Sequence, residues 1–282
     1  MKIKANYLSI QELGQRSNQE DSIYPSLGER ISGNDIFILC DGMGGHECGE
    51  VASQAVCKAM SSYLVANPNA TLESALDVAY DALDEKDTHS VKKMGTTMTL
   101  VKLEDDRCIV AHIGDSRVYQ IRPSEKKILY VTKDHSLVND LIDCGELTPE
   151  EARSSSQKNV ITRAMQPNQD RRSKADVAIL TDVQDGDYFY MCSDGMLEVC
   201  DDQEIVNILS LNRPDADKIE ILKSVTAENK DNHSAHLIHI VSCNNHRAID
   251  SEKRTVQKRT LFYPIMLFLL ISLGGIFWYL LH

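Results

Sequence analysis

Runs of apolar residues divide most of the chain into short strands and longer helices. Short segments rich in β-branched and aromatic side chains predict strands at residues 5–10, 35–39, 96–103, 108–113, 118–121, 128–131, 177–180, 188–192 and 237–241. Segments with apolar residues every three or four positions predict helices at residues 50–65, 72–84, 137–144, 203–209 and 216–228. In the first helix we expect Val51, Ala55 and Ala59 on the buried face, with Val56 and Met60 beside them.

The order of these elements indicates the fold class. Between residues 96 and 131 the predicted strands follow one another with no helix between them. This favours antiparallel sheets covered by long helices and disfavours a doubly wound parallel fold. Residues 145–169 break the rhythm, and we expect them to form a surface flap.

The C-terminal residues 261–281 form an apolar run that contains no charged residue. At about 1.5 Å per residue a helix of this length crosses a hydrocarbon core of roughly 30 Å. Tyr263 near one end and Trp278 and Tyr279 near the other are typical of membrane interfaces. We therefore expect a transmembrane helix. The alternative, a buried core helix, is disfavoured because the segment has no polar stripe.

Charge is distributed unevenly along the chain. The formal net charge is -12, from 42 acids and 30 bases. Residues 244–260 carry about +3, so the remainder carries about −15. The basic segment precedes the apolar run and no signal-peptide pattern opens the chain, so the positive-inside bias predicts a single-pass protein of the cell membrane with a cytoplasmic body. Such an acidic body repels nucleic acid, and we expect none as a partner.

The cysteine spacing gives no sign of a metal or disulfide framework, and the apolar pattern predicts the domain boundaries. The eight cysteines include no CxxC pair, so we expect small buried residues and no zinc site or disulfide framework. We predict a globular domain at residues 1–243, a basic juxtamembrane linker at 244–260 and the transmembrane helix at 261–281.

Acidic residues stand at the ends of three apolar strands, next to glycine. Asp41 and Asp194 each precede a glycine, and Asp115 follows one. A carboxylate is costly to desolvate, and glycine lets a backbone carbonyl approach a third group closely. Divalent cations use carboxylate and carbonyl oxygens together. A single Asp-Gly is more simply a turn, but three such acids favour a metal site.

Other chemistries have weaker support. Residues 42–45 are rich in glycine, but no Gly-Lys-Ser/Thr follows, which disfavours a nucleotide-binding loop. Ser193 lacks a nucleophile elbow, and Cys192 lies within an apolar strand. The sequence therefore predicts no covalent nucleophile.

Motifs along the body resemble those of the metal-dependent serine/threonine phosphatases, the protein phosphatase 2C family, in its bacterial form. They occur in the family's order over residues 3–243: RSNQED (16–21), DGMGGH (41–46), GTT (95–97), GDSR (114–117), DHS (134–136), ITRAM (161–165), SDG (193–195) and DN (231–232). The resemblance implies an α+β fold, a four-layer α-β-β-α sandwich of two antiparallel sheets flanked by helices. It also implies two Mn²⁺ or Mg²⁺ ions at one edge of the sandwich.

The resemblance also assigns the site residues. Asp41 should bridge the two ions, with Glu20, Asp21 and the Gly42 carbonyl on one side. Asp194 and Asp231 should hold the second ion. Arg16 should bind the substrate phosphate as a fork, which a planar guanidinium does better than an ammonium. Asp41 and Arg16 are therefore the candidate catalytic residues.

The expected reaction is hydrolysis of phosphoserine and phosphothreonine in proteins. Two metal ions about 4 Å apart lower the pKa of a shared water and neutralise the phosphoryl charge, so no covalent intermediate is needed. Met43 stands where many eukaryotic relatives carry a histidine proposed as general acid, and His46 is only near in sequence. Water or a distant group must then protonate the leaving oxygen. Asp115 and Glu198 are candidate ligands for a third metal ion.

Two other functions have weaker support from the sequence. A catalytically silent, membrane-tethered phosphoprotein-binding module should have lost a metal ligand, yet Asp21, Asp41, Asp194 and Asp231 are all present. A metal-dependent nuclease is disfavoured by the acidic body. The expected partners are phosphorylated proteins, the substrates of a serine/threonine kinase, and membrane lipid around the C-terminal helix.

Overall fold

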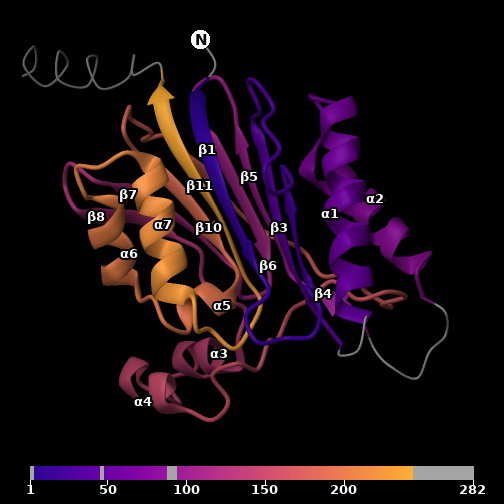
Figure 1. The fold of residues 1–282 in the computed structure, drawn as a ribbon. Helices are drawn as coiled ribbons and strands as arrows, with labels where there is room; N and C mark the ends of the chain where they lie inside the picture. Colours follow the sequence, from indigo (N-terminus) through magenta and orange to yellow (C-terminus); the bar gives the residue numbers. More distant parts are fainter. Residues whose placement is uncertain (1–2, 45–47, 88–93, 244–282) are drawn as a thin grey trace, which may run out of the picture. The chain divides into compact units, whose positions relative to one another are not determined.

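Two antiparallel sheets pack face to face in the computed structural model, which describes residues 3–44, 48–87 and 94–243 (Figure 1). The first sheet has the order β1 (Lys4–Glu12), β11 (His233–Ser242), β10 (Tyr188–Cys192), β7 (Arg117–Arg122) and β8 (Lys127–Val131). The second has the order β2 (Asp21–Tyr24), β3 (Ile36–Met43), β5 (Met98–Leu103), β6 (Cys108–Ile113) and β9 (Asp176–Leu180), and the short β4 (Gly95–Thr96) pairs with the end of β3. The predicted antiparallel sandwich is confirmed.

Helices cover both outer faces of the sandwich (Figure 1). The second sheet is covered by α1 (Cys48–Ala66) and α2 (Leu72–Asp84). The first is covered by α5 (Asp194–Leu197), α6 (Asp202–Leu209) and α7 (Asp215–Thr226). The remaining helices, α3 (Leu137–Asp143) and α4 (Pro149–Ser154), lie at one end of the sandwich near α5.

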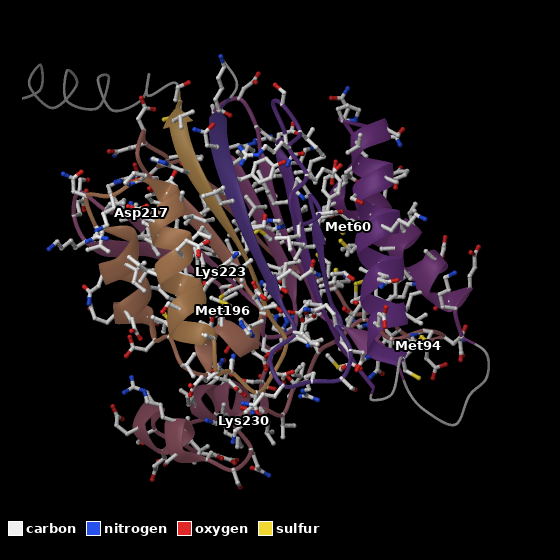
Figure 2. The ribbon with its side chains drawn as sticks, in the orientation of Figure 1. Met60, Met94, Met196, Asp217, Lys223 and Lys230 are labelled. Atoms are coloured by element: carbon white, nitrogen blue, oxygen red, sulfur yellow. The ribbon has the colours of Figure 1, made fainter. Side chains whose placement is uncertain are left out.

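Three apolar layers hold the sandwich together. Met60 of α1 packs against the second sheet, and Met196 of α5 packs against the first (Figure 2). Between the sheets, Phe37 is fully buried, and its ring contacts Tyr7 and His236 edge-on at centroid distances of 5.2 and 5.7 Å. The central layer fixes the two sheets relative to each other, and so aligns their edges.

One face of α1 differs from the prediction. The buried side carries Val56 and Met60, as expected, but Val51 is 38% exposed, and Ala55 and Ala59 are only half-buried. The sheet instead buries small residues such as Ala52 and Ser53. Close approach of a helix to a sheet selects side-chain size as well as polarity, and a stripe of apolar residues does not reveal this.

The predicted strand at 96–103 is interrupted in the structure. The Thr97 N–H donates to the Asp41 carbonyl at 2.8 Å, and the Thr97 Oγ1 accepts the Asp41 N–H at 2.9 Å. Because Thr97 bonds the end of β3 in this way, the chain bends there and β4 and β5 form separate ladders.

Part of the expected flap is regular structure. Within residues 145–169, α4 begins with a capping box between Thr148 and Glu151 and has Pro149 in its first turn. The capping pattern is visible in the sequence and could have predicted this helix.

Within the described residues, no helix is both long and apolar enough to cross a membrane. The predicted linker at 244–260 and the predicted span at 261–281 lie outside those residues. Both stay predictions, as does the domain boundary after Cys243.

Substitution of Phe37 tests the central layer. Phe37→Ala should lower the free energy of unfolding by about 3–5 kcal/mol, because it leaves a cavity between the sheets. Val177→Ala, at a side chain that is 52% exposed on β9, should change it by less than about 0.5 kcal/mol. Denaturant unfolding measures both values, and equal losses would contradict the assignment of Phe37 to the main core.

Candidate metal centre

Asp41 and Asp21 face each other at one edge of the second sheet. Asp41 lies near the end of β3, and its register partner is Asp21 at the start of β2. Thr96 and Thr97 fix the Asp41 backbone, because the Thr96 hydroxyl also donates to the Asp41 carbonyl at 2.9 Å. The Ser193 hydroxyl donates to Asp21 Oδ2 at 3.0 Å and so links the two sheets.

Asp194 and Asp231 lie next to the ends of two strands of the first sheet. Asp194 begins α5 just after β10, and Asp231 lies just before β11. A side chain at Gly195 would lie 2.1 Å from the Asn232 carbonyl oxygen, so glycine is required there. This close approach brings the start of α5 against the start of β11.

Glu20 and Gly42 meet where α1 begins. The Gly42 N–H donates to the Glu20 carbonyl at 3.1 Å. A Cβ at Gly42 would lie 2.1 Å from the Gly49 carbonyl oxygen, and one at Gly49 would lie 2.9 Å from the Glu20 carboxyl carbon. Both glycines are therefore needed for the backbones and the Glu20 carboxylate to pack together.

Arg16 binds the same cluster from a loop. Its Nη2 donates to Asp231 Oδ2 at 2.6 Å, and its side chain is 54% exposed. The Asn232 side chain holds this loop by accepting the Glu20 N–H at 2.8 Å and donating to the carbonyls of Leu13 and Asn18. The loop is thus anchored on both sides of Arg16.

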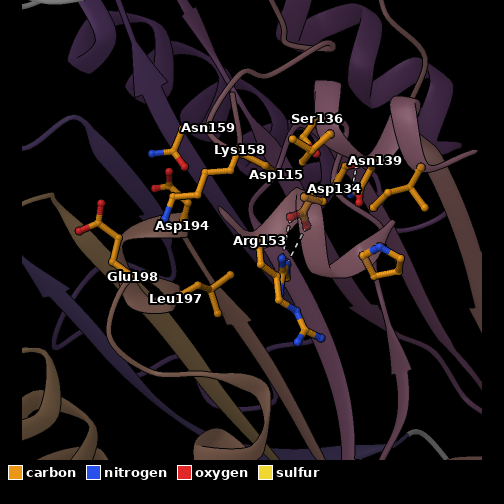
Figure 3. A pocket seen from close by; sticks show the side chains of 15 residues that line it. Asp115, Asp134, Ser136, Asn139, Arg153, Lys158, Asn159, Asp194, Leu197 and Glu198 are labelled. Atoms are coloured by element: carbon orange, nitrogen blue, oxygen red, sulfur yellow. Dashed lines mark hydrogen bonds and ion pairs between the residues drawn. The ribbon is translucent and has the colours of Figure 1, made fainter. Parts of the chain in front are cut away.

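Asp115 and Glu198 lie beside Asp194. All three side chains line one pocket of about 430 Å³ (Figure 3). Asp115 follows β6 and is 7% exposed, whereas Glu198 follows α5 and is exposed. The candidates for a third ion therefore border the principal cluster.

Burial and mutual repulsion raise the pKa of these carboxyls. Burial raises the pKa of Asp21 to about 7, with contributions from the charges of Asp194 and Asp231. Burial and the Asp194 charge raise the pKa of Asp115 to about 7. The pKa values of Asp41 and Asp194 are raised mainly by burial, and these two carboxyls are in hydrogen-bond contact. Such a cluster is stable only with bound protons or cations.

The residues fit divalent metal ions. Asp21 Oδ1 and Asp115 Oδ1 are buried and, among the described residues, have no hydrogen-bond partner. The donors are carboxylates with one backbone carbonyl, the oxygen set that Mn²⁺ and Mg²⁺ prefer. The structure thus brings together the predicted site residues Arg16, Glu20, Asp21, Asp41, Gly42, Asp115, Asp194, Glu198 and Asp231. Met43 lies in β3, and His46 lies outside the described residues.

A second group has metal-ligand residue types but unsuitable hydrogen bonding. The ligand atoms of His112, His135 and Asp176 lie within 4.8 Å of one another. The Gly114 N–H donates to His135 Nδ1 at 3.0 Å, so this nitrogen carries no hydrogen, and burial lowers the His135 pKa. His135 Nε2 must then carry the ring hydrogen, and it faces Asp176 Oδ2 at 3.2 Å. A metal would require an imidazolate there, so we interpret the contact of His135 with Asp176 as a polar pair and not as a metal site.

The sequence motifs also contain residues that position the site and whose role the sequence does not predict. Thr97 clamps Asp41 and contacts the Ser116 hydroxyl at 2.9 Å. Ser193 orients Asp21, and Asn232 holds the Arg16 loop. Each stands within a motif quoted above, but a motif does not state which backbone group a hydroxyl or amide will bind.

The chain is similar in sequence to known phosphatases over most of its length. The model of the family described as protein phosphatase 2C matches residues 14–237. Protein phosphatase PhpP of Streptococcus pneumoniae is 34% identical over 225 residues, which cover 76% of this chain and 87% of that protein. Serine/threonine protein phosphatase PstP of Mycobacterium tuberculosis is 35% identical over 202 residues, which cover 70% of this chain and 37% of PstP.

Solved structures agree with the sequence matches. The crystal structure of the M. tuberculosis phosphatase PstP/Ppp superposes with a TM-score of 0.74 at 29% identity, covering 86% of this chain and all of that one. The PstP catalytic domain in complex with two manganese ions has a TM-score of 0.69, also at 29% identity and with the same coverage.

The raised carboxyl pKa values predict a pH-dependent stability. An acid whose pKa is raised on folding stabilises the fold below its unfolded pKa, and this stability is lost as pH rises from about 4 to 7. We therefore compare the melting temperature of Asp115→Asn with that of the wild type in the absence of metal. The variant minus wild-type difference should increase by roughly 5 °C when the pH is raised from 5 to 7.5. Buried histidines contribute equally to both proteins and cancel.

Calorimetry in EDTA measures this difference. Asp106→Asn, in the exposed turn between β5 and β6, is the control and should show no such gain. Mn²⁺ at pH 7.5 should stabilise the wild type more than Asp115→Asn. A difference that shrinks as pH rises would contradict the electrostatic account of the cluster.

Proposed function

Because the chain belongs to the protein phosphatase 2C family, we propose that it hydrolyses phosphoserine and phosphothreonine esters in proteins. The family confirms two predictions: the chain is an enzyme, a protein phosphatase, and its cofactor is Mn²⁺ or Mg²⁺. The observation that carries the proposal is the carboxylate cluster with Arg16 beside it. The cluster offers oxygen ligands to cations, and Arg16 offers a fork to a phosphate.

In the proposed enzyme different carboxylates are the ligands of the two ions. Asp41, which Thr97 fixes and which lies beside acids of both sheets, would hold both ions. Glu20 and the Gly42 carbonyl would hold one ion, and Asp194 and Asp231 would hold the other. Asp21 would act through direct or water-mediated contact. When bound, the ions supply an activated water and neutralise charge on the phosphoryl group.

Arg16 positions the phosphate in this proposal. Its guanidinium keeps donors free for a phosphate, because among the described residues its side chain donates only to Asp231. The hydrogen bond to Asp231 orients the fork and is the main cause that raises the Arg16 pKa, with smaller contributions from the charges of Asp231, Glu20 and Asp194. Substrate and metal are thus bound through one shared residue, Asp231.

The test of the proposed function is loss of turnover with an intact fold. Asp194→Asn should lower Mn²⁺-dependent release of phosphate from a phosphothreonine peptide by roughly 100-fold or more, because an amide replaces a charged ligand. Asp105→Asn, in the exposed turn between β5 and β6, is the matched control and should keep full activity. Unchanged turnover in a folded Asp194→Asn protein would exclude this site as the catalytic centre.

We also propose that the enzyme is tethered to the cell membrane, with its catalytic domain in the cytoplasm. The support is the apolar run at residues 261–281, which follows the basic segment 244–260. Each base near an anionic lipid surface contributes on the order of 1 kcal/mol to binding. The substrates would then be phosphoproteins near that membrane, phosphorylated by a serine/threonine kinase.

Removal of the C-terminal segment tests the tether. A protein ending at Asn245 should be soluble and keep near-wild-type activity on a small phosphopeptide, because residues 1–243 form one compact unit. The full chain should fractionate with membranes, and protease outside sealed right-side-out vesicles should leave its body uncut. Unfolding of the shortened protein, or digestion of the body from outside, would contradict the proposed anchor or its orientation.

A further inference from the structure

The pocket beside Asp194 is lined by side chains of both charges (Figure 3). The carboxylates Asp115, Asp194 and Glu198 line it from the sandwich edge. Arg153 from the last turn of α4 and Lys158 from the segment that follows it line the same pocket. The metal centre and this segment therefore open onto one cavity of about 430 Å³, within the usual range of ligand sites, roughly 300–1,000 Å³.

The two cations of this pocket are available to a ligand. Arg153 and Lys158 are exposed, and within the described residues neither side chain has an ion-pair or hydrogen-bond partner. Arg117, which lines the same pocket, is different: it is bidentate with Asp134 at 2.7 Å and also contacts Tyr119 and Asp202. Arg117 is thus a structural cation, and Arg153 and Lys158 are the unsatisfied ones.

The segment that carries these cations is held in place. The capping box of Thr148 and Glu151 fixes the start of α4. Behind Lys158, the Val160 carbonyl accepts the Leu137 N–H at 2.8 Å, and the Thr162 N–H donates to the His135 carbonyl at 2.8 Å. Contacts on both sides therefore set the backbone from which Arg153 and Lys158 reach the pocket.

We propose that Arg153 and Lys158 select phosphoproteins that carry an acidic residue next to the phosphorylated serine or threonine, an inference that rests on the proposed function. Arg16 contacts the cluster through Asp231, and Asp194 joins that cluster to the pocket. When Arg16 and the metal ions bind the phosphate, the pocket remains available to the part of the peptide next to the phosphorylated residue. There the flanking carboxylate meets the guanidinium and the ammonium.

Charge complementarity decides between an acidic and a basic flank. Bound divalent cations neutralise Asp194 and its neighbours, whereas nothing in the described structure neutralises Arg153 and Lys158. Asp134 also lines the pocket but is paired with Arg117, so Glu198 is the acid that remains. An acidic flank should therefore lie toward Arg153 and Lys158 and away from Glu198. A basic flank would instead contact Glu198 and be repelled by two cations.

Peptide selectivity tests the proposal. Three phosphothreonine peptides that differ only in carrying Glu, Gln or Lys beside the phosphothreonine would be compared by kcat/KM with Mn²⁺. The wild type should prefer Glu over Gln by roughly three- to ten-fold, as expected for two partly exposed ion pairs, and salt should weaken this preference. In Arg153→Ala/Lys158→Ala the Glu-to-Gln ratio should fall to about one. In Arg153→Glu/Lys158→Glu the Lys peptide should become the best substrate.

The controls separate the possible failures. Lys127→Ala/Arg213→Ala removes the same two residue types from exposed positions outside the pocket lining, and should keep the wild-type ratio. Melting temperatures verify that all variants fold. An unchanged ratio in both pocket variants, with normal turnover, would overturn the selectivity and leave the phosphatase standing. No metal-dependent phosphate release from any peptide or from p-nitrophenyl phosphate by the wild type would overturn the proposed function, and with it this inference.

Discussion

Repulsion among carboxylates gathered at one edge of the sandwich is the constraint that the rest of the structure serves. Asp21 and Asp41 come from one sheet and Asp194 and Asp231 from the other, so the cluster exists only when the two sheets are aligned. Burial raises the pKa of Asp21, Asp41 and Asp194, so the folded chain without metal favours their protonated, uncharged forms. The apolar layer between the sheets must supply the stability that this repulsion removes. A bound cation makes the electrostatic energy of the cluster favourable, because the carboxylates that repel one another all attract the ion.

Preorganisation explains why so many neutral polar groups surround the acids. Thr97 fixes the backbone of Asp41, Ser193 fixes the side chain of Asp21, and Asn232 fixes the loop that carries Arg16 and Glu20. None of these groups adds charge, so none competes with an ion for the carboxylates. Each instead reduces the freedom that a carboxylate would lose when it binds the ion. The result is a site that is costly without metal and pre-shaped for it.

The sequence predicted most strands and the antiparallel sandwich. It also predicted Asp41, Asp115 and Asp194 as site residues, because acids at the ends of apolar strands are a local signal. Arg16, Glu20, Asp21, Gly42 and Asp231 received their roles through the resemblance of their motifs to the family. The sequence did not predict β2 or α5, since each is only four residues long and depends on a distant partner: β2 pairs with β3, and α5 packs through Gly195 on the start of β11. The buried face of α1 was partly wrong because the size of Ala52 and Ser53, and not only polarity, decided which side meets the sheet. The unpaired state of Arg153 and Lys158 also depends on contacts that sequence spacing does not contain.

The charge of the whole molecule makes the local positive charges important. A body with a net charge of about −15 repels an anionic phosphoprotein at long range, so binding must depend on places where the field is inverted. Three features of the described structure oppose it: the carboxylate cluster once it holds divalent ions, the Arg16 fork, and the two cations of the pocket. Arg16 contacts the cluster through Asp231, and the pocket cations share their cavity with Asp194, so all three features lie around the same cluster. Repulsion elsewhere on the body then favours substrates that present their phosphate and acidic neighbour to these features and to no other part of the enzyme.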